Sequence, residues 1–412
     1  MSRRVSLATL FSIILIDSIG YAIIVPVLAP ILLSDSPKMM ASSSSEMRYL
    51  MYGFALGLYD LVMLYAAPML GEMSDQIGRK KVLVLTMLGV IGSYFLLAVS
   101  TTYGLVSVLL LARIIGGATA GGQAVAQAAV VDLSNAKNKA VLLSLCLLAS
   151  SGGFIAGPAL GAVLMNSKLV PWFDYTIPLY ATALLGVISL LLLMASYKNE
   201  RPATGRITRK TLDLGAGVRC LVDGWHHPRI RKLAIIFTLH QIAWGAYFLF
   251  MPSFLLKRFD FNETQIAVFL SVLGIGYCVA YGVVNPLLAR WLSSKTMTAI
   301  GIWSTLALLV ASFFTRDVEL IWWIAIPIGT TVSVAYGALI TMFSDSVGEA
   351  KQGWALGITI SVTALAMGVV PVVSGIISSL HYSAPIVLGA VSMVASGIVL
   401  MTLRDTEPVS RA

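Results

Sequence analysis

The sequence has few charged residues. Its 412 residues include 28 Lys and Arg and 19 Asp and Glu, which together make 11% of the chain, whereas about a quarter of a soluble domain is charged. Hydrophobic residues make up 58%. This composition excludes an ordinary soluble domain and favours a chain that lies largely within a lipid bilayer.

Cysteine and histidine are also scarce. Cys146, Cys220 and Cys278 show neither a disulfide framework nor metal-ligand spacing. His226 and His227 lie in a basic segment without acids or cysteines at ligand spacing, so we expect no metal and no cofactor. The apolar runs contain no H-E-x-x-H or G-x-S-x-G motif, which disfavours a membrane-embedded enzyme.

Long apolar runs fill the rest of the chain. Each is close to the roughly 20 residues that a helix needs to cross about 30 Å of hydrocarbon. The first is too long for the core of a signal peptide and should be retained. We therefore predict an all-α membrane protein with twelve transmembrane helices, at residues 7–33, 47–70, 82–100, 104–131, 141–164, 176–197, 232–256, 263–288, 297–314, 319–342, 353–378 and 383–403.

The basic residues predict the orientation of these helices. If both termini are cytoplasmic, the cytoplasmic segments hold 21 Lys and Arg and the opposite side holds six. Basic residues concentrate on the cytoplasmic side of membrane proteins. The net charge of +9 is then explained by contacts with an anionic leaflet, so we expect the lipid bilayer as a partner and no nucleic acid.

The chain divides into two similar halves. We expect six-helix bundles at 1–197 and 232–412, joined by a polar cytoplasmic loop at 198–231. Pro158 follows Asp132 by 26 residues, and Pro371 follows Asp345 by the same distance. Parallel six-helix repeats place a solute site between the halves, and rocking of one half against the other gives alternating access. We expect a monomer in a plasma membrane, the inner membrane of a bacterium.

Four chargeable side chains interrupt the apolar runs: Asp17, Asp60, Arg113 and His240. A charge near the centre of a membrane helix costs about 2.5–3.5 kcal/mol on insertion scales and usually marks a pathway for ions or substrates. Counting 1.5 Å per residue from the helix ends places all four near the midplane. They predict a protein that moves a solute or protons.

Structural explanations compete with these functional ones. Arg113 could form a buried pair with a carboxylate, which is weak evidence for function. His240 could bind a backbone carbonyl, and only its titration range favours proton transfer. Asp17 and Asp60 favour function, because there are two acids and one nearby fixed cation.

Polar and aromatic residues on the same runs are candidates for the lining of a central cavity. Gln123 and Gln127 share one helix face, where they either line the cavity or bond a neighbouring helix. The full set is Tyr21, Tyr52, Tyr59, Gln123, Gln127, Gln241, Trp244, Tyr277, Asn285 and Tyr336.

Three motifs carry a family resemblance. GEMSDQIGRKK at 71–81 resembles the G-x-x-x-D-x-x-G-R-K-K loop between the second and third helices of the major facilitator superfamily. LARIIGGATAGG, with Arg113, resembles its fourth-helix motif, and SSGGFIAGPALGAVL resembles a fifth-helix motif found mainly in proton-coupled exporters. The first 165 residues are most similar to tetracycline–proton antiporters and related multidrug exporters, which also carry an Asp nine residues before a Pro in the first helix.

The motif residues predict gating elements. Gly71 and Gly78 should permit a tight loop with positive φ. Arg79 should pair with Asp132, and Asp75 should face the positive N-terminus of the eleventh helix near Gly353, which together would latch one state. Gly153, Gly157 and Gly161 form a small-residue stripe for close packing, and Pro158 supplies a hinge.

Departures from the resembling exporters limit the substrate. Those exporters have a His in the eighth helix and an Asp in the ninth, but 263–288 contains no His and 297–314 no carboxylate. Asp60 and His240 are additional here. We therefore do not expect tetracycline to be the substrate.

These observations predict a proton-coupled secondary transporter. We expect an efflux antiporter for amphipathic or cationic small molecules, because two acids favour a positive or hydrogen-bond-donating substrate. The alternative is a proton symporter that imports a nutrient or a metal-chelating metabolite such as a siderophore. A non-transporting receptor or an enzyme is a more remote alternative.

Overall fold

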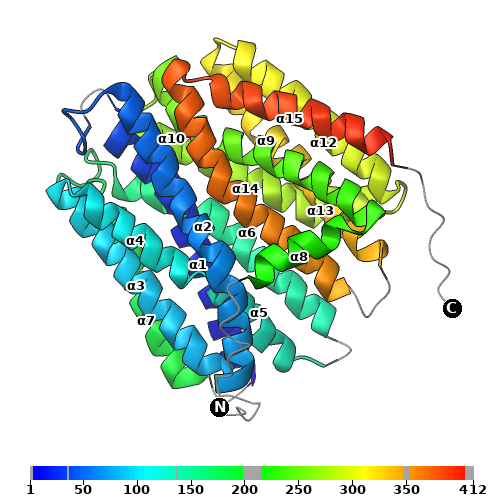
Figure 1. The fold of residues 1–412 in the computed structure, drawn as a ribbon. Helices are drawn as coiled ribbons and strands as arrows, with labels where there is room; N and C mark the ends of the chain where they lie inside the picture. The colour runs from blue at the N-terminus through cyan, green and yellow to red at the C-terminus, as the bar shows by residue number, and fades with distance from the viewer. Residues whose placement is uncertain (1–2, 35–36, 136–137, 198–214, 348–351, 404–412) are drawn as a thin grey trace. The chain divides into compact units, whose positions relative to one another are not determined.

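A computed structural model describes residues 3–34, 37–135, 138–197, 215–347 and 352–403. All regular elements in these ranges are helices (Figure 1). They are α1 (Arg3–Leu33), α2 (Ser45–Ile77), α3 (Arg79–Tyr103), α4 (Val106–Ala118), α5 (Gly122–Asp132), α6 (Lys139–Leu164), α7 (Ile177–Ser196), α8 (Ala216–Trp225), α9 (Pro228–Phe259), α10 (Glu263–Val279), the π-helix η2 (Ala280–Val284), α11 (Asn285–Leu288), α12 (Ser294–Phe314), α13 (Val318–Asp345), α14 (Gln352–Leu380) and α15 (Ala384–Met401).

The twelve predicted membrane-spanning helices are confirmed. Twelve helices, or runs of two or three consecutive helices, in the described ranges are long and apolar enough to cross a bilayer. Several extend beyond the apolar runs, because backbone hydrogen bonding continues into the polar flanks. The placement of both termini on the cytoplasmic side stays a prediction.

Two compact units divide the chain, one formed by residues 1–214 with 261–271 and the other by 215–260 with 272–412. In the first, α1 packs on α6 and α7, α3 on α4 and α7, and α2 on α4. In the second, α9 packs on α14 and α15, α12 on α13 and α15, and η2 on α13. These are the same neighbours in the same order, which supports the internal repeat. The bundle boundaries at 197 and 232 stay a prediction.

The fourth span is broken near its middle. Helix α4 ends at Ala118, and α5 begins at Gly122. Glycines on either side of the break allow close approach: a methyl group on Gly117 would lie 2.4 Å from the carbonyl oxygen of Tyr59, and one on Gly121 would lie 2.8 Å from Leu70. Irregular backbone at membrane depth is tolerated where protein covers it, and α2 covers this break.

The predicted loop at 71–81 is wrong in its extent. Helix α2 continues through Gly71 to Ile77, and α3 begins at Arg79, so Gly78 alone connects them. Gly78 has φ of 99°, as predicted. Gly71 has no positive φ, and a methyl group there would meet nothing within 4 Å. Its helical environment therefore does not require glycine.

The predicted small-residue stripe on α6 is present at two of its three positions. A methyl group on Gly153 would lie 2.4 Å from Cβ of Ser18, and one on Gly157 would lie 2.6 Å from the carbonyl oxygen of Ile19. Gly161 is less crowded, with its nearest neighbour at 3.5 Å. Helix α6 remains continuous through Pro158, and the hinge role of this proline stays a prediction.

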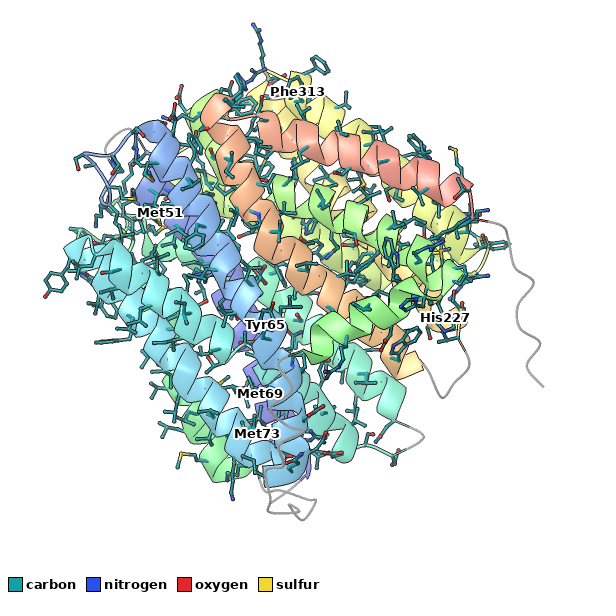
Figure 2. The ribbon with its side chains drawn as sticks, viewed as in Figure 1. Met51, Tyr65, Met69, Met73, His227 and Phe313 are labelled. Atoms are coloured by element: carbon teal, nitrogen blue, oxygen red, sulfur yellow. The ribbon has the colours of Figure 1, made fainter. Side chains whose placement is uncertain are left out.

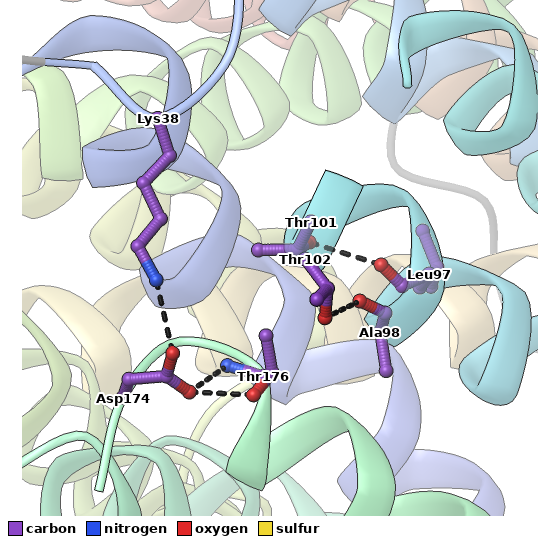
Figure 3. A network of polar contacts seen from close by, with 7 residues as sticks. All are labelled: Lys38, Leu97, Ala98, Thr101, Thr102, Asp174 and Thr176. Carbon is purple, nitrogen blue, oxygen red and sulfur yellow. Dashed lines mark hydrogen bonds and ion pairs between the residues drawn. The ribbon is translucent and has the colours of Figure 1, made fainter. Parts of the chain in front are cut away.

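A polar contact joins two loops of the first unit, one after α1 and the other before α7 (Figure 3). Lys38 Nζ lies 2.9 Å from Asp174 Oδ2, and Thr176 donates from its backbone and hydroxyl to Asp174 Oδ1. Burial acts to raise the pKa of Asp174, but the hydrogen bonds from Thr176 and Lys38 outweigh it and hold that pKa below its ordinary value. Asp174 is therefore ionised, and this contact ties the loop after α1 to the loop before α7.

Candidate functional site

Asp17 lies on α1 in a half-buried position. Among the described residues its carboxylate has no hydrogen bond and no ion pair, although Tyr59 and Tyr94 lie close enough to interact with it electrostatically. One turn later, a side chain on Gly20 would meet the Tyr94 hydroxyl at 2.7 Å. The first unit therefore holds a partly accessible carboxylate without a neutralising partner.

Asp60 lies on α2 and is 5% exposed. The Tyr21 hydroxyl donates to Asp60 Oδ2 over 3.3 Å, which joins α1 to α2. Tyr21 also packs edge-on against Tyr59 at 5.8 Å and against Phe154 at 6.0 Å between ring centroids. The structure thus brings Asp60, Tyr21 and Tyr59 together in one acidic and aromatic cluster.

Arg113 does not form the buried carboxylate pair that was one of its two predicted roles. Its Nε donates to the carbonyl oxygen of Ala55 over 2.8 Å, and a terminal nitrogen donates to that of Leu56 over 3.3 Å. Its guanidinium carbon lies 4.6 Å from the ring centroid of Tyr59. No carboxylate oxygen of the described residues lies within 4.0 Å of the Arg113 guanidinium nitrogens. The guanidinium instead donates to backbone carbonyl groups of α2. Arg113 still acts electrostatically on Asp60.

In the second unit, His240 is 1% exposed on α9. One ring nitrogen, Nε2, lies 3.2 Å from the carbonyl oxygen of Val332, and Nδ1 lies 3.3 Å from Gln241 Oε1. Gln241 in turn donates to Thr363 Oγ1 over 3.1 Å. This carbonyl contact is the structural explanation considered for His240, and the network links α9, α13 and α14.

Aromatic pairs occupy equivalent places in the two units. Trp244 on α9 packs edge-on against Tyr277 on α10, with centroids 5.8 Å apart. Tyr277 lies nine residues before Pro286, as Tyr59 lies nine residues before Pro68. Each unit therefore joins its first and second spans by an aromatic contact, and the aromatic residue of the second span has the same register in both units.

The other predicted lining residues differ in their environments. Gln123 donates to Ser150 Oγ over 3.2 Å and so bonds a neighbouring helix, whereas Gln127 is half-buried with no hydrogen bond among the described residues. Tyr52 is fully buried, and its place in the lining of a central cavity stays a prediction. Asn285 follows the π-helix, and its Oδ1 is buried without a hydrogen-bond partner among the described residues.

The predicted contact between Arg79 and Asp132 is present. Arg79 Nε lies 3.1 Å from Asp132 Oδ2, and both side chains are largely buried. Arg79 also pairs with Asp75 one turn earlier, but the Asp75 side chain is 63% exposed. The approach of Asp75 to the helix end near Gly353 concerns two units and stays a prediction, as does gating by this group.

Asp132→Asn should slow the interchange of states more than Asp75→Asn, with little change in substrate affinity for either. Hydrogen bonds between charged groups in protected positions contribute about 1.5–3 kcal/mol, whereas exposed pairs contribute about 0–1 kcal/mol. Exchange rates and binding affinities of the two variants test this. Equal turnover in both variants, or a collapse of affinity in either, would contradict the latch.

Some functional candidates were missed from the sequence. Tyr94 lies against Gly20 of α1, and Ser150 hydrogen-bonds Ser18 of α1 and Gln123 of α5. Nothing in the apolar runs that contain Tyr94 and Ser150 marks them as functional. On α2, Tyr65, Met69 and Met73 stand four residues apart on one face (Figure 2), and Tyr65 is 44% exposed. Methionine adapts to ligands of varied shape, and the four-residue spacing could have revealed this stripe.

No group of three or more His, Cys, Asp or Glu side chains in the described ranges could hold a metal ion.

The sequence matches the model for the Major Facilitator Superfamily over residues 10–358 and 233–412. It is 31% identical over 296 residues to the tetracycline resistance protein, class H, of Pasteurella multocida, covering 72% of this chain and 70% of that one. It is 22% identical to the quinolone resistance protein NorA of Staphylococcus aureus, covering 95% and 94%. A D-xylose–proton symporter structure superposes with a TM-score of 0.76 at 12% identity, covering 96% and 98%, which shows a shared fold.

Proposed function

The chain belongs to the major facilitator superfamily, and we propose that it is a proton-coupled antiporter that exports amphipathic or cationic small molecules. Its family and its structural neighbours are transporters. It is a multi-pass protein of the bacterial inner membrane.

The observation that carries the proposal is Asp17. A half-buried carboxylate on a membrane helix, without an ion pair or hydrogen bond among the described residues, gains most from binding a proton or a cation. An acid that exchanges one for the other couples proton entry to substrate release. Asp17 is therefore the proposed coupling residue.

The cluster around Asp60 supports a substrate with positive and apolar parts. Tyr21, Tyr59 and Phe154 offer aromatic faces next to the acid, and aromatic faces attract cations. Arg113 offsets one of the two negative charges of Asp17 and Asp60, which leaves the other for a substrate cation or a proton.

Export is favoured over import by the fifth-helix motif and by the two resistance proteins among the relatives. The symporter alternative has the support of a shared fold alone. Tetracycline stays outside the expected substrates, because the eighth- and ninth-helix residues of its exporters are absent here.

Substrate accumulation in energised inverted membrane vesicles tests the proposal. A panel of cationic, neutral amphipathic and anionic compounds should be screened with and without a proton uncoupler. Uphill uptake of cationic compounds that stops with the uncoupler is expected. Uptake that persists without a proton gradient, or accumulation in right-side-out vesicles, would refute proton-driven export.

Asp60→Asn should narrow the substrate range, with the largest loss for cationic compounds. The variant keeps an acceptor for the Tyr21 hydroxyl but removes the charge that attracts a cation. Neutral compounds should still be driven uphill through Asp17. Uptake rates for matched cationic and neutral compounds measure this, and an equal loss of every substrate would contradict a role in selectivity.

A further inference from the structure

The helix α8 precedes the seventh span and does not cross the membrane. It has ten residues and ends at Trp225, and α9 begins at Pro228. Two intervening residues hold α8 close to the end of the span. Helix α8 also packs against α14.

One face of α8 is fixed to the protein. Gly224 is buried, and a methyl group there would lie 2.7 Å from Cδ1 of Ile358 on α14. Next to α8, the His227 ring packs edge-on against Trp354 with centroids 5.5 Å apart. These contacts set the rotation of α8 about its axis.

A second face is apolar and exposed. Val222 is 53% exposed and Trp225 is 55% exposed. They stand three residues apart and therefore on one side of the helix, with Val222 about 200° from Gly224 at 100° per residue. Asp223, which is also exposed, lies about 100° around the helix from Val222.

Basic side chains surround this apolar face. Arg219 is exposed one turn before Val222, and the guanidinium carbon of Arg231 lies 5.9 Å from the ring centroid of Trp225. The described residues 215–232 contain four Lys and Arg and one acid. A surface of exposed Val and Trp flanked by cations complements the boundary between acyl chains and anionic headgroups.

We propose that α8 binds anionic phospholipid, with Val222 and Trp225 among the acyl chains and Arg219 and Arg231 on headgroup phosphates. Tryptophan prefers this depth of the bilayer, and arginine binds phosphate oxygens with paired donors. Because α8 rests on α14, bound lipid would stabilise one position of that helix. This inference shares with the proposed function only the premise that the protein lies in a membrane.

The test uses the full-length protein with Cys146, Cys220 and Cys278 replaced by Ser. A fluorophore is attached through Val222→Cys or, as a matched control one residue later, through Asp223→Cys. Each protein is reconstituted into vesicles of phosphatidylcholine, with or without phosphatidylglycerol. Brominated acyl chains quench a probe in the bilayer, and iodide quenches a probe in water.

We expect brominated chains to quench the probe at position 222 and iodide to quench the probe at position 223. Phosphatidylglycerol should increase the lipid quenching at 222, and Arg219→Gln combined with Arg231→Gln should abolish that increase. Equal iodide quenching at both positions would overturn the proposal. Shielding of position 222 from both quenchers would show that protein, and not lipid, covers it. If the arginine variants still show the increase in lipid quenching with phosphatidylglycerol, binding of the anionic headgroup by these arginines would be refuted. None of these readouts depends on transport, so the result is separate from the test of export.

Discussion

Asp17→Asn is expected to abolish uphill transport while exchange of substrate down its gradient continues. Asparagine keeps the shape of the side chain, so α1 should pack unchanged against α6. It cannot take up or release a proton, and without that step a proton gradient has no means of driving the substrate. Because no described residue pairs with Asp17, the substitution leaves no partner charge unsatisfied.

Accumulation and counterflow in the same reconstituted vesicles separate these two effects. Asp174→Asn is the matched control, since it removes an acid of the same size from a loop outside the membrane-spanning helices. That control should retain uphill transport. Full accumulation by the Asp17→Asn protein would exclude this residue from coupling.

Gly153→Ala and Gly157→Ala are expected to destabilise the protein and to impair transport together. Added methyl groups would lie 2.4 Å from Ser18 and 2.6 Å from the Ile19 carbonyl oxygen, and neither α1 atom belongs to a flexible chain end. Overpacking of this kind costs about 1–3 kcal/mol. The displaced segment of α1 directly follows Asp17, so its carboxylate would move as well.

Two neighbouring glycines provide controls for this crowding. A methyl group on Gly152 would have its nearest neighbour at 3.6 Å, and one on Gly161 at 3.5 Å, which are ordinary contacts. Gly152→Ala and Gly161→Ala should therefore keep the parent midpoint of thermal unfolding. If all four variants unfold at the same temperature, close approach of α1 and α6 is not what these glycines provide.

The sequence predicted the features that depend on composition and spacing. Twelve spans follow from hydrophobic length, and the repeat from Asp132–Pro158 and Asp345–Pro371 reappears as equivalent helix neighbours in the two units. The contact of Arg79 with Asp132 was predictable because both residues belong to a recurrent motif at the helix ends.

Features that depend on backbone atoms were not predictable. Arg113 binds the carbonyl oxygens of Ala55 and Leu56, and a carbonyl is present at every residue, so no residue type marks the acceptor. Likewise, Gly71 lies in a helix and not in a turn, because the helical hydrogen bonds of α2 extend beyond its apolar run. The amphipathic helix α8 was hidden by the polar composition of its surroundings.

The broken fourth span has a consequence for how the protein is inserted during synthesis. Its two segments have 13 and 11 residues, and each is shorter than the roughly 20 residues that cross a bilayer alone. The 18-residue window that represents this span has a mean hydropathy of 1.4, the lowest among the twelve described spans, and the span carries Arg113. Helix α2 leaves the ribosome first and holds the carbonyl groups that Arg113 needs. We therefore expect the translocon to release these two spans into the lipid as a pair, with the arginine already bound.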